Sequence, residues 1–590
     1  MRNLTPTYQE KYSIFECGFH SFLGQNRTQF GIKFFMFGFI YLLLDLEILL
    51  IFPFASSEYV NSIYGLSMVL IFTLILTLGF TYEIAKNALK IESRQVRFDL
   101  LKKSNEVTEL LGKTSDFSKL ECVLKNINNS PGSNILDNSL NNSSESKILN
   151  NSLNHHLKKY YLKIVNAKGH YLYTEDGREI FDAASGAAVA CIGYGNEKVI
   201  EAICDKYKQG VHYLSTSYWK DEDVLKLNDF LLKSTEYKMS KVFITGSGSD
   251  AIEASIKVAR QYFFDKDKET QRHVIIAREN SYHGNTLGAL SVSNFIVRQE
   301  PYYPIMTDNV EHISSCNPYR QQIEGESDAA FIARKAQELE NKINEIGPEK
   351  VMCFIMEPVS GAALGCVPAP LGYLKAMQEV CHKYGVLLIF DEIMCGMGRT
   401  GTLHAWEVEG VVPDILVIGK GLAGGYFPLS AILVNTKVCE GLKTQEFIHG
   451  HTFDAVPVGA VAALIVQEII KKWNLLENVS KQGVYLRDSL KAKLGDHPNV
   501  GDVRGIGLFI GIELVKDKTT KEPFDTNVGV AQIIVDLALS EYNMTIYKGT
   551  GGADGLNGDH IMIQPPFTIT AKDVDHIVEV VTAVIERVFE

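Results

Sequence analysis

The sequence has little positive charge, and its cysteines show no spacing typical of disulfides or of a metal site. Its 58 lysine and arginine residues are outnumbered by 70 acidic residues, which gives a formal net charge of -12. Because no basic stripe is available to replace the counterions of a phosphate backbone, a nucleic-acid-binding surface is excluded. The ten cysteines form no CxxC pair and no His/Cys cluster at metal spacing. The sequence therefore predicts neither a disulfide framework nor a metal site, as in a reducing compartment.

The N-terminal part differs in composition from the rest of this 590-residue chain, which is too long for one ordinary domain. Two apolar runs, residues 31–54 and 63–83, predict two transmembrane helices. A signal peptide followed by a buried helix is the alternative, but no short cationic region or cleavage site precedes the first run. Lysine and arginine residues are concentrated before the first predicted helix and after the second, and the short loop between the helices has none. Both flanking segments are therefore expected on the inner side of the membrane. Asp45 and Glu47 lie within the first run, where an ionised carboxylate has to face protein or water.

A family resemblance is carried by IFECGFHSFLGQNRTQFGIKFFMFGFIYLLLDLEILLIFPF, the second apolar run and YEIAKNALKIESRQ. This segment resembles subunit 3 of mitochondrial NADH:ubiquinone oxidoreductase, respiratory complex I, over about Tyr8 to Gln95, within a membrane segment of residues 1–95. The resemblance implies a mobile inner-side loop around Cys17, buried carboxylates at Asp45 and Glu47, and other complex I subunits as partners. It implies the mitochondrial inner membrane as the location, with the C-terminal part on the matrix side. That family has three spans, and this segment contains two.

A linker is expected at residues 96–155. From Asn126 onward it is rich in asparagine and serine, and ILDNSLN at residue 135 returns as ILNNSLN at residue 148. Such a composition cannot bury enough apolar surface to offset chain entropy, so it predicts a disordered tether. A tether between two unrelated halves indicates a recent gene fusion or an error of sequence assembly, rather than a bifunctional protein.

Five apolar segments beyond the linker each end at a polar or glycine-rich turn, which predicts an α/β fold with a mostly parallel sheet. They are KVFIT before GSGSD, HVIIA before RENSYHG, VMCFIM before EPVSG, GVLLIF before DEIMCGMGRTG, and ILVI before GKGLAGG. Ligands of open parallel sheets bind outside the carboxyl ends of the strands. The side chains expected to converge there are Ser249, Tyr282, Glu357, Asp391 and Lys420.

The residue types at these strand ends favour pyridoxal 5'-phosphate as the cofactor. The helix start at Gly248 and Ser249 can bind a phosphate, and it matches neither the GxGxxG nor the GxxxxGKS pattern. Tyr282 can stack on a flat ring. Lys420 would form the internal Schiff base and then move a proton as general base and acid, while Asp391 would keep the ring nitrogen protonated. Taken singly, each has an ordinary structural explanation: a solvated lysine, a capped helix, a packed tyrosine or a strand-end carboxylate.

Residues 156–590 resemble a class III pyridoxal-phosphate aminotransferase of the omega-amino-acid type. The resemblance is carried by TGSGSDAIEASIKVAR, SYHGNTLGAL, EPVSGAALG, IFDEIMCGMGRTG, DILVIGKGLAGGYFPL, HGHTFDAVPVGAVAAL and RGIGLFIGIEL. It implies a fold-type-I homodimer with a large cofactor-binding domain at residues 210–455 and a smaller α+β domain at residues 156–209 and 456–590. It also implies the cofactor-binding residues: Gly248, Ser249, Tyr282, His283, Glu357, Asp391, Ile393, Lys420 and, reaching the phosphate of the other subunit, Thr452.

Three further residues are candidates for the substrate pocket. Tyr218 and Trp219 lie between two helical stretches, where aromatic residues line a pocket or belong to the core. Met562 falls where some members of the family carry an arginine for the substrate carboxylate. Nearer the start of this part, Tyr171 to Asp182 predicts a β-hairpin.

The expected activity is the transfer of an amino group from an amine or omega-amino acid to a 2-oxo acid such as pyruvate. A decarboxylase, a racemase and an aminomutase stay open because all of them share the ring and the lysine. A membrane subunit of an electron-transfer complex is the alternative from another class, and it concerns the N-terminal part. Without that part, the enzyme would be soluble in the cytoplasm or the matrix.

Overall fold

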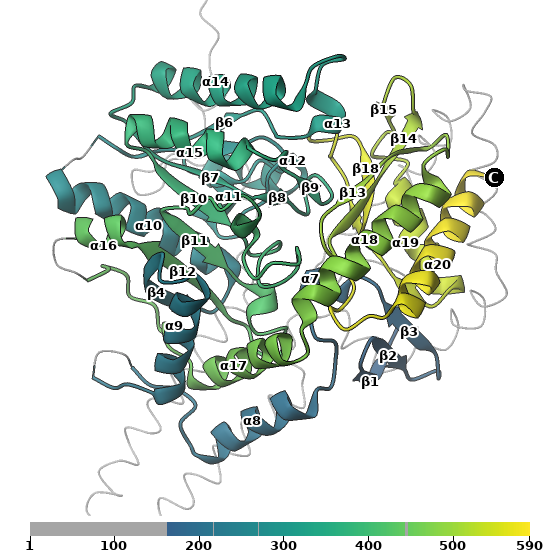
Figure 1. Cartoon of the computed structure of the whole chain (residues 1–590), viewed down its shortest axis with the longest axis horizontal. Helices are drawn as coiled ribbons and strands as arrows, with labels where there is room; N and C mark the ends of the chain where they lie inside the picture. The colour runs from purple at the N-terminus through teal and green to yellow at the C-terminus, as the bar shows by residue number, and fades with distance from the viewer. Residues whose placement is uncertain (1–161, 216–217, 269–270, 443–445) are drawn as a thin grey trace, which may run out of the picture. The chain divides into compact units, whose positions relative to one another are not determined.

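A seven-stranded sheet forms the centre of the larger part of the molecule (Figure 1). The computed structural model describes residues 162–215, 218–268, 271–442 and 446–590. In spatial order the strands are β4 (Met239–Thr245), β12 (Ser430–Asn435), β11 (Ile415–Ile418), β10 (Leu387–Asp391), β7 (Val351–Met356), β5 (Val274–Arg278) and β6 (Val310–Ile313). β12 is antiparallel to both of its neighbours, and the other neighbouring pairs are parallel. All five predicted strands are confirmed, and their carboxyl ends meet at one edge.

Both faces of this sheet are buried. In β10, Leu387 and Ile389 belong to the core on the side of α10 (Gly248–Asp267), whereas Leu388 and Phe390 belong to the core on the opposite side. Helices of that opposite core are α9 (Glu222–Ser234), α14 (Asp328–Ile346), α15 (Tyr373–Tyr384) and α17 (Pro457–Lys472). Burial on two faces explains why these strands are continuously apolar in sequence and do not alternate with polar residues.

The smaller part contains two further sheets. One joins β1 (Ile164–Lys168), β2 (Tyr171–Thr174), β3 (Glu179–Asp182) and β16 (Met544–Thr545), and the other joins β13 (Val500–Gly505), β14 (Ile510–Asp517), β18 (Asp559–Ile563) and β17 (Tyr547–Gly549), with β15 (Glu522–Pro523) beside β14. The predicted hairpin is confirmed by the antiparallel pair β2 and β3. β3 also pairs in parallel with β16, which comes from near the C-terminus. A separate core packs α18 (Leu475–Leu494), α19 (Val530–Glu541) and α20 (Ala571–Phe589) on these strands.

Short elements connect these layers and carry several residues of the site described below. They are α7 (Ser185–Ala188), α8 (Glu197–Lys208), α11 (Leu287–Val292), α12 (Ile296–Gln299), η3 (Glu300–Ile305), α13 (Pro318–Gln321), β8 (Val359–Ser360), β9 (Val367–Pro368), η4 (Ala405–Val408), η5 (Lys420–Leu422) and α16 (Thr436–Gly441).

The two predicted membrane spans, the carboxylates Asp45 and Glu47, Cys17 and the linker lie outside the described residues. Among the residues that are described, no helix combines the length and apolar character needed to cross a bilayer.

Candidate active site

A cavity of about 280 Å³ lies at the carboxyl edge of the large sheet. It is lined by eight of the residues predicted from the sequence: Gly248, Ser249, Tyr282, His283, Glu357, Asp391, Ile393 and Lys420. They come from the ends of β4, β5, β7, β10 and β11 and from the turns that follow. The topology brings them together because these strands run in the same direction and therefore end at the same edge.

Asp391 and His283 form a buried pair. His283 Nδ1 lies 2.8 Å from Asp391 Oδ2, and the side chains are 0% and 5% exposed. Asp391 Oδ1 accepts the backbone N–H of Ile393 at 3.0 Å. These two contacts fix the orientation of the Asp391 carboxyl group. This corner of the cavity therefore presents an oriented carboxyl group that can pair with a cationic ring atom.

Lys420 begins η5 directly after β11 and has a left-handed φ of 41°. Its Nζ donates a hydrogen bond of 2.9 Å to the carbonyl oxygen of Ala187. Burial lowers the pKa of Lys420 to about 8, although Asp391 and Glu357 act in the opposite direction. An amine with such a pKa is partly neutral near pH 8, and the neutral form is the one that can attack a carbonyl carbon.

The turn that carries Ala187 is fixed by the buried carboxylate of Asp182. Ser185 and Ala188 in this turn have left-handed φ values of 49° and 63°, a conformation that needs support from its surroundings. Asp182 accepts four hydrogen bonds, from Ala184 N–H at 3.0 Å, Gly186 N–H at 3.1 Å, Tyr194 Oη at 2.5 Å and Thr545 Oγ1 at 2.6 Å. The acceptor for Lys420 is therefore held by a residue outside the cavity.

The start of α10 offers a cradle for an anion. The Oγ of Ser247, the N-cap, accepts the N–H of Asp250 at 3.2 Å, and the first-turn amides of Gly248 and Ser249 have no acceptor within the helix. A Cβ built on Gly248 would lie 2.9 Å from Ile393 Cδ1, so glycine allows the helix start to approach Ile393 closely. With the helix dipole, these amides suit a phosphate group.

Glu357 follows β7 and is buried beside the pair formed by Asp391 and His283. Its Oε2 accepts the N–H of Gly361 at 2.8 Å, and its Oε1 accepts the N–H of Tyr282 at 3.4 Å. Burial raises the pKa of the Glu357 carboxyl. Glu357 thus fixes the backbone of Tyr282 and lines the cavity.

Four sequence-predicted residues do not line this cavity. Tyr218 and Trp219 are 87% and 62% exposed, and Thr452 is also exposed. Met562 is fully buried in a small core with Met394 and Phe509. Six lining residues were missed. Gly284, Ala362 and Met394 lie in the segments that follow β5, β7 and β10, whereas the other three are Ala187, Arg298 and Tyr547. Ala187, Arg298 and Tyr547 follow no apolar strand of the large sheet, which was the pattern used to find the others. In the structure, Tyr547 pairs with Met562, one of the sequence-predicted residues.

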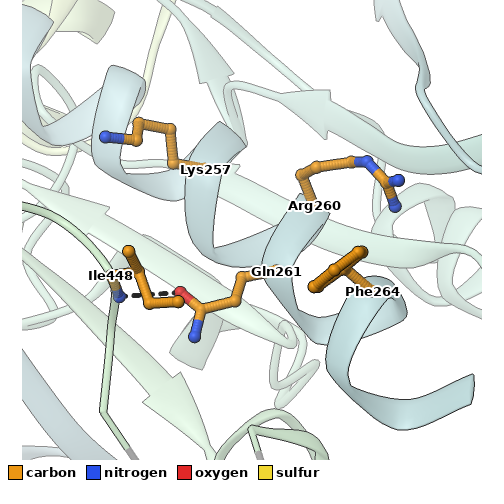
Figure 2. A pocket seen from close by; sticks show the side chains of 5 residues that line it. All are labelled: Lys257, Arg260, Gln261, Phe264 and Ile448. Carbon is orange, nitrogen blue, oxygen red and sulfur yellow. Dashed lines mark hydrogen bonds between the residues drawn. The ribbon is translucent and has the colours of Figure 1, made fainter. Parts of the chain in front are cut away.

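A second hollow, also of about 280 Å³, lies farther along α10. Figure 2 shows its lining, Lys257, Arg260, Gln261, Phe264 and Ile448, with Gln261 Oε1 accepting the backbone N–H of Ile448 at 2.8 Å. It contains no carboxylate and none of the strand-end residues described above. The chemistry of the site therefore belongs to the cavity beside Lys420.

Two family models match the chain. Aminotransferase class-III matches residues 152–585, and NADH-ubiquinone/plastoquinone oxidoreductase, chain 3, matches residues 1–91. An aminotransferase of Gibberella zeae is 44% identical over 72% of this chain and 83% of its own length. Gamma aminobutyrate transaminase 2 of Solanum lycopersicum is 31% identical, with coverage of 71% and 90%, and putrescine–pyruvate aminotransferase of Pseudomonas aeruginosa is 32% identical, with coverage of 70% and 88%. A solved omega transaminase from Pseudomonas jessenii, in complex with PMP, has a TM-score of 0.70 at 31% identity and covers 76% of this chain and 98% of that one.

Proposed function

The chain belongs to the class III aminotransferases, and from this membership we propose that the cavity beside Lys420 is where it transfers an amino group from an amine or omega-amino acid to a 2-oxo acid. The enzyme has the fold-type-I architecture of pyridoxal-phosphate transaminases, and its cofactor is pyridoxal 5'-phosphate. The proposal concerns the residues that act and the class of substrate. The single observation that carries it is that Lys420 and Asp391 line the same cavity.

The residues of the cavity fit this cofactor. The amides of Gly248 and Ser249 at the start of α10 would hold the phosphate. Tyr282 and Ile393 would contact the two faces of the ring, and Asp391, supported by His283, would pair with the ring nitrogen. Glu357 would orient the ring. In a homodimer, Thr452 would bind the cofactor phosphate in the site of the other subunit. Its exposure in the single chain is compatible with this role.

Each protein group then has a defined task. When bound, the cofactor ring withdraws the electron pair left behind as a proton leaves the substrate carbon. Lys420 takes that proton and returns it, and its pKa of about 8 allows both steps near neutral pH. The carbonyl of Ala187 orients the amine of Lys420. His283 Nδ1 and the backbone N–H of Ile393 hold the carboxyl group of Asp391 in position, at 2.8 and 3.0 Å from its oxygens.

The test replaces Lys420 by alanine. We expect Lys420→Ala to lose the covalently held cofactor and the formation of alanine from pyruvate. Lys572→Ala, at an exposed position on α20, is the matched control and should behave like the unaltered enzyme. Borohydride reduction followed by peptide mass spectrometry locates the attached cofactor. Attachment at another lysine, or unchanged alanine formation, rejects the assignment of Lys420. Turnover of the amine without any requirement for a 2-oxo acid would instead favour a decarboxylase, racemase or aminomutase.

We propose a second role for the N-terminal part, because residues 1–91 match the chain 3 family of the oxidoreductase. In this proposal, the apolar runs at 31–54 and 63–83 insert in the mitochondrial inner membrane, next to complex I subunits, and the enzyme faces the matrix. Sequencing the messenger RNA across the codons for residues 90–160 tests whether both halves form one chain. Alkaline carbonate extraction of mitochondria then tests insertion. Two separate messages, or release of the enzyme by carbonate, would rule out a membrane-anchored aminotransferase.

A further inference from the structure

Arg298 is a cationic residue of the cavity with no assigned role. It lies on α12 and lines the cavity together with Lys420. Its side chain is exposed, whereas the amine of Lys420 is held inside by the carbonyl of Ala187. The two cationic groups therefore mark the outer and the inner end of one cavity.

Aromatic rings hold the guanidinium of Arg298 in place. Its Cζ lies 4.6 Å from the ring centre of Tyr282 and 5.0 Å from that of Phe295, and these two rings meet edge to face at 6.3 Å. A guanidinium stacked on aromatic rings keeps the N–H groups of its edge available for hydrogen bonds.

No carboxylate within the described residues forms an ion pair with Arg298. The two carboxylates that line the cavity are engaged elsewhere: Asp391 accepts from His283 and the N–H of Ile393, and Glu357 accepts from backbone N–H groups. Arg298 is also the only arginine among the described residues of the lining. Met562, at the position where some members of the family carry an arginine, is buried in a small core and does not line the cavity. The cavity thus offers one fork of N–H donors to an anion that arrives with the substrate.

We propose that Arg298 binds the carboxylate at the far end of an omega-amino acid donor, and that the enzyme thereby selects such donors over simple amines and diamines. The amino end of the donor lies inward, near Lys420, and the carboxylate lies at the exposed end. This inference rests on the proposed aminotransferase function and goes beyond it in fixing the charge at the distal end of the donor. The names of two relatives, a gamma aminobutyrate transaminase and a putrescine–pyruvate aminotransferase, show that this charge differs between related enzymes.

The experiment compares three donors with the same four-carbon chain and different distal groups, at saturating pyruvate. These are 4-aminobutanoate, with a carboxylate; butylamine, with a methyl group; and putrescine, with a second ammonium. For the cofactor-loaded enzyme, we expect kcat/KM to decrease in that order. Arg298→Met keeps a long side chain over Tyr282 but removes the charge. It should lower kcat/KM about 10- to 100-fold for 4-aminobutanoate, the range for hydrogen bonds to a charged group, and leave butylamine within about threefold.

Two further variants and a binding measurement separate charge from packing. Arg298→Lys should recover part of the activity with 4-aminobutanoate, and Arg298→Glu should favour putrescine over 4-aminobutanoate. Arg487→Ala, on α18 away from the cavity, is the control. Calorimetry with pentanoate, which has the carboxylate but no amine, should show weaker binding to Arg298→Met, by a factor similar to the loss in kcat/KM. Each variant should keep the cofactor content of the unaltered enzyme.

Several outcomes would overturn the inference. Equal losses for 4-aminobutanoate and butylamine in Arg298→Met would mean that Arg298 acts through Tyr282 or the cofactor. Unchanged kinetics in that variant would mean that it binds no part of the donor. If the unaltered enzyme used butylamine but not 4-aminobutanoate, the inference would fail while the proposed function stood. If it used no amine donor at all, the proposed function would fail first, and the inference with it.

Discussion

At the scale of single residues, Asp391 and Lys420 have different surroundings. Asp391 is held by His283 Nδ1 at 2.8 Å and by the backbone N–H of Ile393 at 3.0 Å. Lys420 loses hydration through burial, which disfavours its charge and lowers its pKa to about 8. One buried site therefore holds an oriented carboxyl group and an amine that changes protonation near pH 8, as general acid and base catalysis by Lys420 requires.

Asp391→Asn tests the role of the negative charge. Asparagine keeps the size of the side chain and can still bond to His283, but it cannot stabilise a protonated ring nitrogen. We expect cofactor content to stay near normal while the rate of amino transfer falls at least about 100-fold, which corresponds to about 2.7 kcal/mol of transition-state stabilisation. Cofactor content by absorbance and single-turnover rates with one amine donor give the two quantities. A fully loaded variant with near-normal rates would contradict the role proposed for Asp391.

The lowered pKa of Lys420 predicts how cofactor capture depends on pH. Only the neutral amine attacks the aldehyde, so in cofactor-free enzyme the rate of covalent capture should rise about tenfold per pH unit at acidic pH and level off above about pH 8. The rate increases with pH because Lys420 is protonated, and therefore unreactive, below its pKa. Stopped-flow absorbance after mixing with pyridoxal phosphate measures the rate. A rate still rising near pH about 10, as for an ordinary exposed lysine, would contradict the prediction.

At the scale of elements, the turn after β3, residues 183–188 including α7, links the smaller part of the molecule to Lys420. Asp182 ends β3, fixes this turn through two backbone N–H groups, and also accepts from Thr545 on β16. The turn then presents the carbonyl of Ala187 to Lys420. The strands of the smaller part thereby set the position of the amine at the end of β11.

Asp182→Asn should destabilise this turn. The amide keeps one acceptor oxygen and replaces the other by a donor group, so a buried N–H or hydroxyl loses its acceptor, at a cost of about 1 to 3 kcal/mol. We expect a corresponding decrease in the free energy of unfolding by urea and slower cofactor capture. Asp496→Asn, an exposed position after α18, is the control. If both variants unfold at the same urea concentration, the turn does not depend on Asp182.

The sequence was informative where one element alone determines the position of a residue. Ser249, Asp391 and Lys420 follow apolar strands, and parallel strands end together, so their convergence could be predicted. Arg298 lies on the four-residue helix α12, which has no periodic pattern, and its contacts depend on how the segment after α11 folds back. Tyr547 reaches the cavity from β17. In the structure, Tyr547 lies opposite Met562 on β18. The sequence predicted Met562 for the substrate pocket, so it identified the strand next to the correct one but not the side chain that lines the cavity.

At the scale of the whole molecule, the described residues contain the cores on both faces of the large sheet and the core of the smaller part. Every residue that lines the cavity lies in residues 187–547, and the aminotransferase family model begins at residue 152. We therefore expect the enzyme to need nothing from the N-terminal part for its chemistry.

A shortened chain tests this independence. Residues 152–590 alone should fold, bind the cofactor and match the kcat of the full chain within about twofold, because the cavity and its supports are retained. A chain of residues 183–590 should not fold, since it lacks β1 to β3 and leaves β16 without a partner. Solubility, thermal unfolding and amino transfer measure the comparison. Inactivity of 152–590 in solution would show that the N-terminal part contributes to the enzyme.

The pairing of β3 with β16 has a consequence for biosynthesis. The hydrogen bond from Thr545 to Asp182 joins residues 363 positions apart, so the ribosome has made most of the enzyme before the support for the Ala187 turn exists. Contacts of such long sequence separation form late in folding. A nascent polypeptide would therefore acquire its reactive amine geometry only as translation finishes, and growing chains would not capture aldehydes in the cell before the fold that controls them is complete.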